Sequence, residues 1–160
     1  EQDISPMKMQ KLVFFAHGWF LAVDGQPLID EQIEAWKYGP VVPSLFHCLK
    51  RYGTSAIDHP IVVSTIRDSP GDKLVLQRTT PSLDDFNDDT VDLAKAVINK
   101  TWQQYGQYSA VRLSNMTHEA GGPWDRVMED YNRSPPRGTD IPREYIEEHF
   151  KNSLNRHLHE

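Results

Sequence analysis

The chain has a single cysteine among its 160 residues, no long apolar run and no excess of basic residues. One cysteine rules out a disulfide within the chain and favours a reducing compartment, so we expect a cytoplasmic protein. No apolar segment approaches the roughly 20 residues that a membrane-spanning helix needs, so no membrane contact is expected. The net charge of −6, from 17 basic and 23 acidic residues, disfavours nucleic acid as a partner because phosphate contacts need a basic surface.

The sequence also lacks the common signatures of catalysis. It contains no glycine-rich phosphate loop and no nucleophile elbow. His118 and Glu119 begin like a zinc-protease motif, but Gly122 stands where the second histidine belongs, and the other histidines show no ligand spacing. We therefore expect no catalytic residue, no metal and no cofactor. The alternative that stays open is a metal-independent enzyme in which His118 serves as an acid or base.

A short acidic segment, DDFNDD, has part of the pattern of a calcium-binding loop. Asp85, Asn87 and Asp89 occupy alternate positions, as the ligands of such a loop do. The glycine that should come next is Thr90, and the distal glutamate position holds Ala96. The favoured interpretation is that these acidic residues precede a helix and face the positive end of its dipole.

The spacing of apolar residues predicts a mainly α fold. Ser5 is expected to cap a first, central helix that starts at Pro6 and stops at Gly25. Five further helices are expected at about residues 43–52, 88–105 and 110–118, from 123 onward and from 142 onward, with residues 151–160 frayed. Two β-branched runs around a Ser-Pro-Gly-Asp sequence predict a small β-hairpin or a mobile insert. The expected architecture is a compact single-domain helical bundle over residues 1–160, with a variable insert at about 57–83.

The single cysteine is expected to be buried. Leu45, Cys48, Leu49 and Tyr52 follow one another at helical spacing, which places the thiol on the apolar face of its helix. Free cysteine is among the most buried residue types, so packing is favoured over a reactive thiol.

One short segment concentrates aromatic bulk and backbone stiffness. We call residues 34–43, EAWKYGPVVP, the aromatic corner. Pro40 holds Gly39 away from helical angles, so a fixed turn is expected there. Two interpretations of Trp36 and Tyr38 stay open. Either they lock the corner against the first helix, or they remain exposed as an anchor for a partner.

Three blocks of the sequence together are similar to the Panacea domain family, which includes the SocA-type antitoxins and related phage-associated proteins. In the first helix the matching residues are Lys8, Gln10, Lys11, Leu12, Ala16, Gly18 and Trp19. In the aromatic corner they are Glu34, Ala35, Trp36, Tyr38, Gly39, Pro40, Val41, Val42 and Pro43. In the third block they are Thr117, His118, Gly122, Pro123 and Trp124. The segment from about residue 57 to 83 is the exception, and partner choice is expected to differ from that of relatives there.

The resemblance implies an antitoxin of a bacterial or prophage toxin–antitoxin system. Its partner is then expected to be a cognate toxin protein, encoded next to it and neutralised by direct protein–protein binding. A second mechanism within the same resemblance is a proteolytic adaptor that delivers the toxin to the ClpXP protease, and the sequence does not choose between the two. The residues that the resemblance marks as partner-binding or scaffold residues are Trp36, Tyr38, Gly39, Pro40, Val41, Pro43, His118 and Trp124.

Overall fold

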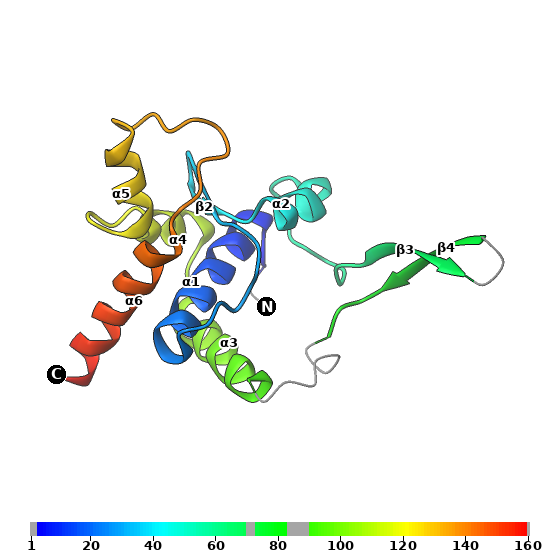
Figure 1. The fold of residues 1–160 in the computed structure, drawn as a ribbon, viewed down its shortest axis with the longest axis horizontal. Helices are drawn as coiled ribbons and strands as arrows, with labels where there is room; N and C mark the ends of the chain where they lie inside the picture. Colours follow the sequence, from blue (N-terminus) through cyan, green and yellow to red (C-terminus); the bar gives the residue numbers. More distant parts are fainter. Residues whose placement is uncertain (1–2, 70–72, 83–89, 160) are drawn as a thin grey trace.

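The computed structural model describes residues 3–69, 73–82 and 90–159 (Figure 1). The calcium-like DDFNDD segment (residues 84–89) and the tip of the predicted hairpin (residues 70–72) lie outside these residues. The described part is mainly α with a small β-hairpin in the insert, as the sequence predicts, and a second small β-hairpin, which was not predicted, lies at residues 34–41. Its elements are α1 (Pro6–Asp24), β1 (Glu34–Trp36), β2 (Gly39–Val41), α2 (Pro43–Leu49), the 3-10 helix η1 (Lys50–Tyr52), β3 (Val63–Ser69), β4 (Lys73–Thr79), α3 (Val91–Tyr105), α4 (Ala110–Thr117), α5 (Pro123–Asp130) and α6 (Arg143–Leu158). No helix within these ranges is long and apolar enough to span a membrane.

Helix α1 begins and ends where the sequence predicts. The Ser5 side chain accepts a hydrogen bond from the backbone N–H of Lys8 at 3.3 Å, and Pro6 occupies the first turn. Gly25 follows the helix with a left-handed backbone, φ 78°, and its N–H donates to the carbonyl oxygen of Leu21 at 3.0 Å. Both ends are therefore set by local chemistry that a sequence pattern can show.

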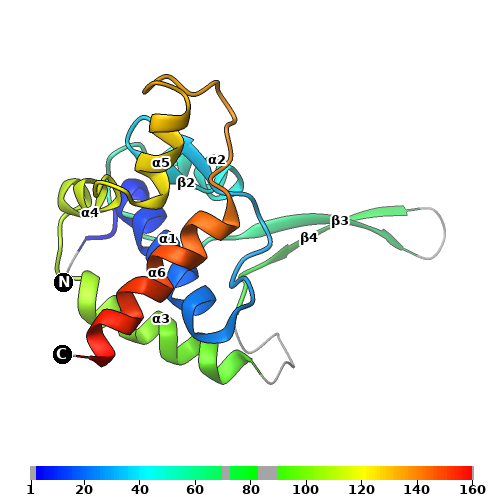
Figure 2. The same ribbon diagram turned by 60° about the vertical axis from the view of Figure 1, so that its left-hand side comes forward.

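Helix α1 also lies at the centre of the helical body, as expected. It packs against α3, α4, α6 and β2 (Figures 1 and 2). Its crossing with α6 is close because Gly18 has no side chain there: a Cβ at this position would overlap the ring of Phe150. The Phe150 ring packs edge-on against Trp19 and Phe14, with ring centroids 5.0 and 5.8 Å away.

The expectation that residues 151–160 fray is wrong for residues 151–158, because α6 continues to Leu158. Local contacts support its last turns. Lys151 Nζ lies 2.6 Å from the Glu147 carboxylate, one turn earlier, and the Ser153 hydroxyl donates to the carbonyl oxygen of His149 at 3.0 Å. The Glu147–Lys151 ion pair stabilises the helix surface without any apolar contact, so apolar content alone understates the length of α6.

The expectation for the cysteine is also wrong: Cys48 is exposed. Helix α2 packs against α1 and buries Leu49 completely, while Leu45 is half-buried. Helix α2 is short, and only a narrow part of its surface contacts the helical body. Cys48, one position before Leu49, lies outside that contact. Helical spacing identifies the apolar face of such a helix but not how much of that face is covered.

The predicted hairpin is present, and we call it the arm: β3 and β4, which pair antiparallel with Ile66 opposite Leu76. It extends away from the helical body in both views (Figures 1 and 2). Among the described residues, each strand makes its main contacts with the other strand. The base of the arm is tied to the start of the chain, where the Ile57 N–H donates to the carbonyl oxygen of Ile4 at 2.8 Å.

Candidate partner-binding surfaces

The aromatic corner is a β-hairpin whose turn lies at Lys37 and Tyr38. Strands β1 and β2 pair antiparallel, with Trp36 opposite Gly39. Gly39 is buried and has φ 99°, outside helical angles as the following proline predicts. A Cβ there would come within 2.5 Å of the Thr117 hydroxyl oxygen. The position therefore requires glycine for its backbone conformation and for space alike.

Polar side chains of α1 hold strand β2 in place. The Lys11 ammonium donates to the carbonyl oxygen of Pro40 at 2.9 Å. Gln10 accepts a hydrogen bond from the N–H of Val42 at 2.9 Å and donates to its carbonyl oxygen at 3.1 Å. Lys11 is only 1% exposed, and burial lowers the pKa of its ammonium group to about 7. The corner is thus fixed to the central helix by buried hydrogen bonds.

A third buried polar residue of α1 contacts the residue that follows helix α3. Lys8 is buried and its ammonium donates to the carbonyl oxygen of Gly106, just after α3, at 2.6 Å. Reasoning from apolar spacing missed all three of these residues, because polar residues in a helix ordinarily mark its solvent side. The available signal was the family pattern, in which Lys8, Gln10 and Lys11 are among the matching positions.

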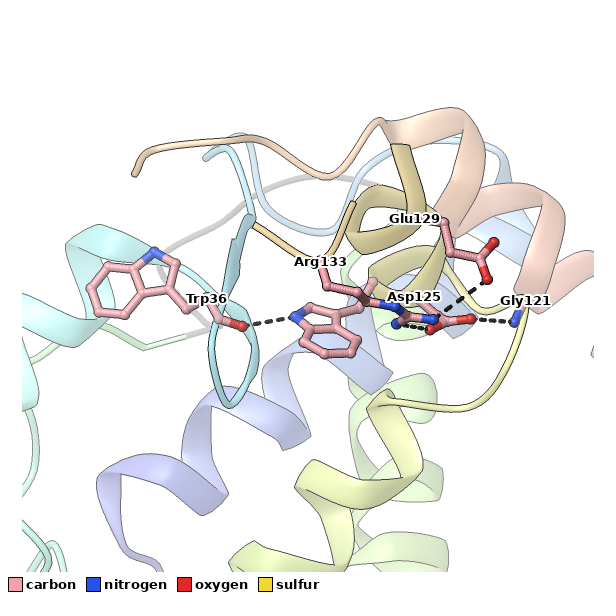
Figure 3. Close-up of polar contacts among 6 residues, drawn as sticks. Trp36, Gly121, Asp125, Glu129 and Arg133 are labelled. Atoms are coloured by element: carbon pink, nitrogen blue, oxygen red, sulfur yellow. Dashed lines mark hydrogen bonds and ion pairs between the residues drawn. The ribbon is translucent and has the colours of Figure 1, made fainter. Parts of the chain in front are cut away.

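The third block of the family pattern meets the corner directly. The Trp124 indole N–H donates to the carbonyl oxygen of Trp36 at 2.8 Å (Figure 3). The His118 ring stacks on Trp124, with centroids 3.8 Å apart and planes inclined by 16°. The Trp36 ring points to the other side of its strand (Figure 3), where it packs on Phe46 at 4.8 Å. Residues far apart in the sequence are thereby joined into one scaffold.

The eight marked residues divide by exposure. Gly39, Pro40, Val41 and Trp124 are buried, and Trp36, Pro43 and His118 are half-buried. Tyr38 is 62% exposed, and the ammonium of Lys37 lies 5.3 Å from its ring centroid. Tyr38 is therefore the one member of this set whose side chain projects mainly into solvent.

His118 has the environment of a packed residue. Its Nε2 atom is buried and has no hydrogen-bond partner among the described residues. Burial lowers the pKa of the imidazole, the positive charge of Lys11 lowers it further, and Asp125 partly opposes both. Within the described residues, no group of three or more His, Cys, Asp or Glu side chains could hold a metal ion.

Helix α5 is held at both ends by one carboxylate. The buried Asp125 accepts a hydrogen bond from the N–H of Gly121 at 2.9 Å and forms an ion pair with Arg133 (Figure 3). The Gly121 bond, followed by the Arg133 contacts, lowers the pKa of this carboxyl group. Glu129 adds a longer contact with Arg133 at 3.4 Å. This network fixes the loop that follows α5, and sequence reasoning did not anticipate it.

Several exposed apolar side chains lie on the arm. Ile66 is 69% exposed and Leu76 is 55% exposed. Because these two residues are directly opposite in the register, their side chains lie on the same face of the hairpin. Val62, Val63 and Val75 are also exposed. Because side chains alternate along a strand, Val63 and Val75 lie on the opposite face of the hairpin from Ile66 and Leu76, so both faces carry exposed apolar side chains. Exposed apolar surface gathered in this way commonly marks a protein–protein contact.

Comparison with known proteins agrees with the pattern of the three blocks. Residues 9–125 match the model of the family described as antitoxin SocA-like, Panacea domain. Antitoxin SocA of Caulobacter vibrioides (strain NA1000 / CB15N) is 30% identical over 148 residues, which are 92% of this chain and 72% of that protein. No solved structure shows significant similarity. The chain therefore belongs to the SocA-like antitoxin family with a Panacea domain.

Proposed function

We propose that this protein is an antitoxin that neutralises its cognate toxin by direct binding, in the cytoplasm, and that the toxin is encoded beside it. Membership of the family supports an antitoxin role and a toxin partner in general. The observation that carries direct binding is the arm, which presents apolar side chains to solvent, away from the helical body. We further propose that residues 1–160 act as one domain with the arm as its variable insert.

Binding of a partner is expected to stabilise the arm. A two-stranded hairpin is at best marginally stable in water by itself, and it leaves an unpaired row of backbone groups along each edge. Ile66 and Leu76 each stabilise a complex by roughly 1.5–3 kcal/mol when fully buried. A partner that covers this face, or that adds a strand to one edge, therefore gains both apolar burial and backbone hydrogen bonds.

The arm is tested by removing its apolar surface while keeping its strand preference. Ile66→Thr/Leu76→Thr retains β-branched or strand-compatible side chains but removes the exposed apolar groups. We expect affinity for the cognate toxin to fall by about 100-fold, since the loss of about 3 kcal/mol corresponds to that factor. Titration of toxin with each purified protein measures the affinity, and growth rescue on co-expression measures neutralisation.

The matched control removes two exposed apolar groups elsewhere. Val23 at the end of α1 and Val111 on α4 are 52% and 64% exposed, and Val23→Thr/Val111→Thr should leave toxin affinity within about threefold of the native value. Equal losses in the two double variants would contradict a specific role for the arm. Rescue without a detectable complex, accompanied by rapid loss of the toxin, would instead support delivery of the toxin to the ClpXP protease.

His118→Gln tests the enzymatic alternative. The substitution removes the stack on Trp124, so the free energy of unfolding should fall by about 1 kcal/mol, measured by urea denaturation. Rescue should persist, because we assign His118 to packing. His59→Gln, at an exposed histidine, serves as the control and should change stability by less than about 0.5 kcal/mol. A folded, toxin-binding His118→Gln protein that fails to rescue growth would favour catalysis.

A further inference from the structure

A groove of about 500 Å³ lies between β1, helix α5 and the loop that follows α5. Its apolar lining includes Met128, Pro135 and Pro136, together with Trp124. This volume is within the range of sites that bind small ligands, roughly 300–1,000 Å³. The groove lies beside the aromatic corner and on a different element from the arm.

The walls of the groove are tied on both sides. At the start of the loop, Arg133 is paired with the buried Asp125, and its N–H donates to the carbonyl oxygen of Met128 at 2.6 Å. At the end of the loop, the Thr139 carbonyl oxygen accepts from the N–H of Ala35 in β1 at 2.8 Å. A partner entering the groove therefore meets a preformed surface, and little conformational freedom is lost on binding.

The ionisable side chains that line the groove are basic, and one carboxylate, that of Glu34, lies at its edge, where it accepts a hydrogen bond from the Trp36 indole N–H at 2.7 Å. The chain has a net charge of −6, yet the residues that line the groove include Lys37, Arg133 and Arg137 and no acidic residue. Arg133 is already paired with Asp125 and Glu129. Lys37 and Arg137 are exposed and, in the part of the chain that the structure describes, neither forms an ion pair.

We infer that this groove binds an acidic segment of the toxin. An apolar or aromatic side chain of that segment packs between Met128 and the two prolines, and flanking carboxylates pair with Lys37 and Arg137. A guanidinium can hold a carboxylate through two parallel hydrogen bonds, which makes Arg137 the main source of specificity for charge. The identity of the partner rests on the proposed function, whereas the preference for acidic peptides rests on the groove alone.

A peptide selection tests this preference without knowledge of the toxin. A random 12-residue library displayed on phage is selected against the full chain, and we expect the enriched peptides to contain Asp or Glu beside an aromatic or aliphatic residue. The affinity of one enriched peptide is then measured by fluorescence anisotropy. Arg137→Glu should weaken its binding at least tenfold, and raising the salt from 50 to 300 mM should weaken binding to the native protein, because salt screens exposed charges.

Lys100→Glu is the matched control, because Lys100 is an exposed cation on α3, away from the groove. It should change peptide affinity less than twofold. Enrichment of peptides without acidic residues, or equal weakening by Lys100→Glu, overturns the inference. Rescue of growth from the toxin is scored separately. If the protein rescues growth but does not bind acidic peptides, the inference about the groove is overturned and the proposed function stands. If acidic peptides bind through Arg137 but the toxin does not bind, the preference of the groove for acidic peptides stands, and the toxin is not its occupant.

Discussion

Gly39→Ala should lower the free energy of unfolding by about 3 kcal/mol, the sum of backbone strain at positive φ and overpacking. The added methyl group would lie 2.5 Å from the Thr117 hydroxyl oxygen and 2.9 Å from Lys11 Nζ. Neither neighbour can move freely, since Thr117 donates to the Ser114 carbonyl oxygen and Lys11 to that of Pro40. Urea denaturation followed by tryptophan fluorescence measures the change.

Gly25→Ala separates the two causes. Gly25 also has a positive φ, 78°, but a Cβ there meets no atom within 4 Å. This variant should lose only the cost of backbone strain, about 1 kcal/mol. If both variants lose the same amount, close packing at the aromatic corner contributes nothing beyond the turn itself.

The free energy of unfolding should rise between pH 7 and pH 9, and Lys11→Met should remove most of that rise. The pKa of Lys11 falls from 10.5 to about 7 on folding because the ammonium is buried. Between these two values the unfolded chain binds more protons than the folded chain, so stability increases with pH. The increase is about 1.4 kcal/mol per pH unit, or about 2–3 kcal/mol over this interval.

The interval from pH 7 to pH 9 separates the titration of Lys11 from that of other groups whose pKa is shifted. Burial lowers the pKa of both His17 and His118 below the ordinary histidine value, so both act below pH 7. Burial raises the pKa of Tyr105 above its ordinary value of 10.0, so it acts above pH 9. Lys100→Met, at an exposed lysine, should keep the native slope in urea denaturation at each pH. A native slope in Lys11→Met would mean that the Lys11 ammonium stays charged in the folded protein.

Local signals predicted the helices well because they act over a few residues. Ser5 and Pro6 start α1, and Gly25 ends it, through contacts within one turn. Burial of Lys11 was not predictable in this way. Its partner is the carbonyl oxygen of Pro40, which is brought near only by the packing of β2 on α1. The exposure of Cys48 was not predictable either, because helical spacing does not show how small a part of α2 contacts the helical body.

The candidate surfaces were predictable only in part. Glycine and proline at the corner predicted a stiff turn, and the turn composition predicted the arm. Which aromatic residue projects into solvent depends on long-range contacts: the carbonyl oxygen of Trp36 is held by Trp124, whereas Tyr38 lies in the turn and its side chain is exposed. The groove joins β1 with the loop after α5, so it exists only once those distant segments have met.

The attachment of the arm has a consequence for how such proteins diversify. A substitution at the fully buried Leu49 or Ile146 disturbs several elements at once, and natural selection removes it because the fold weakens. Ile66 and Leu76 are exposed on the arm, so a substitution there leaves the packing of the helical body unchanged. Mutations can therefore accumulate in the arm, or a whole hairpin can be exchanged by recombination, without compensating changes in the body. Proteins descended from one ancestral gene can in this way keep the same fold and acquire different partners.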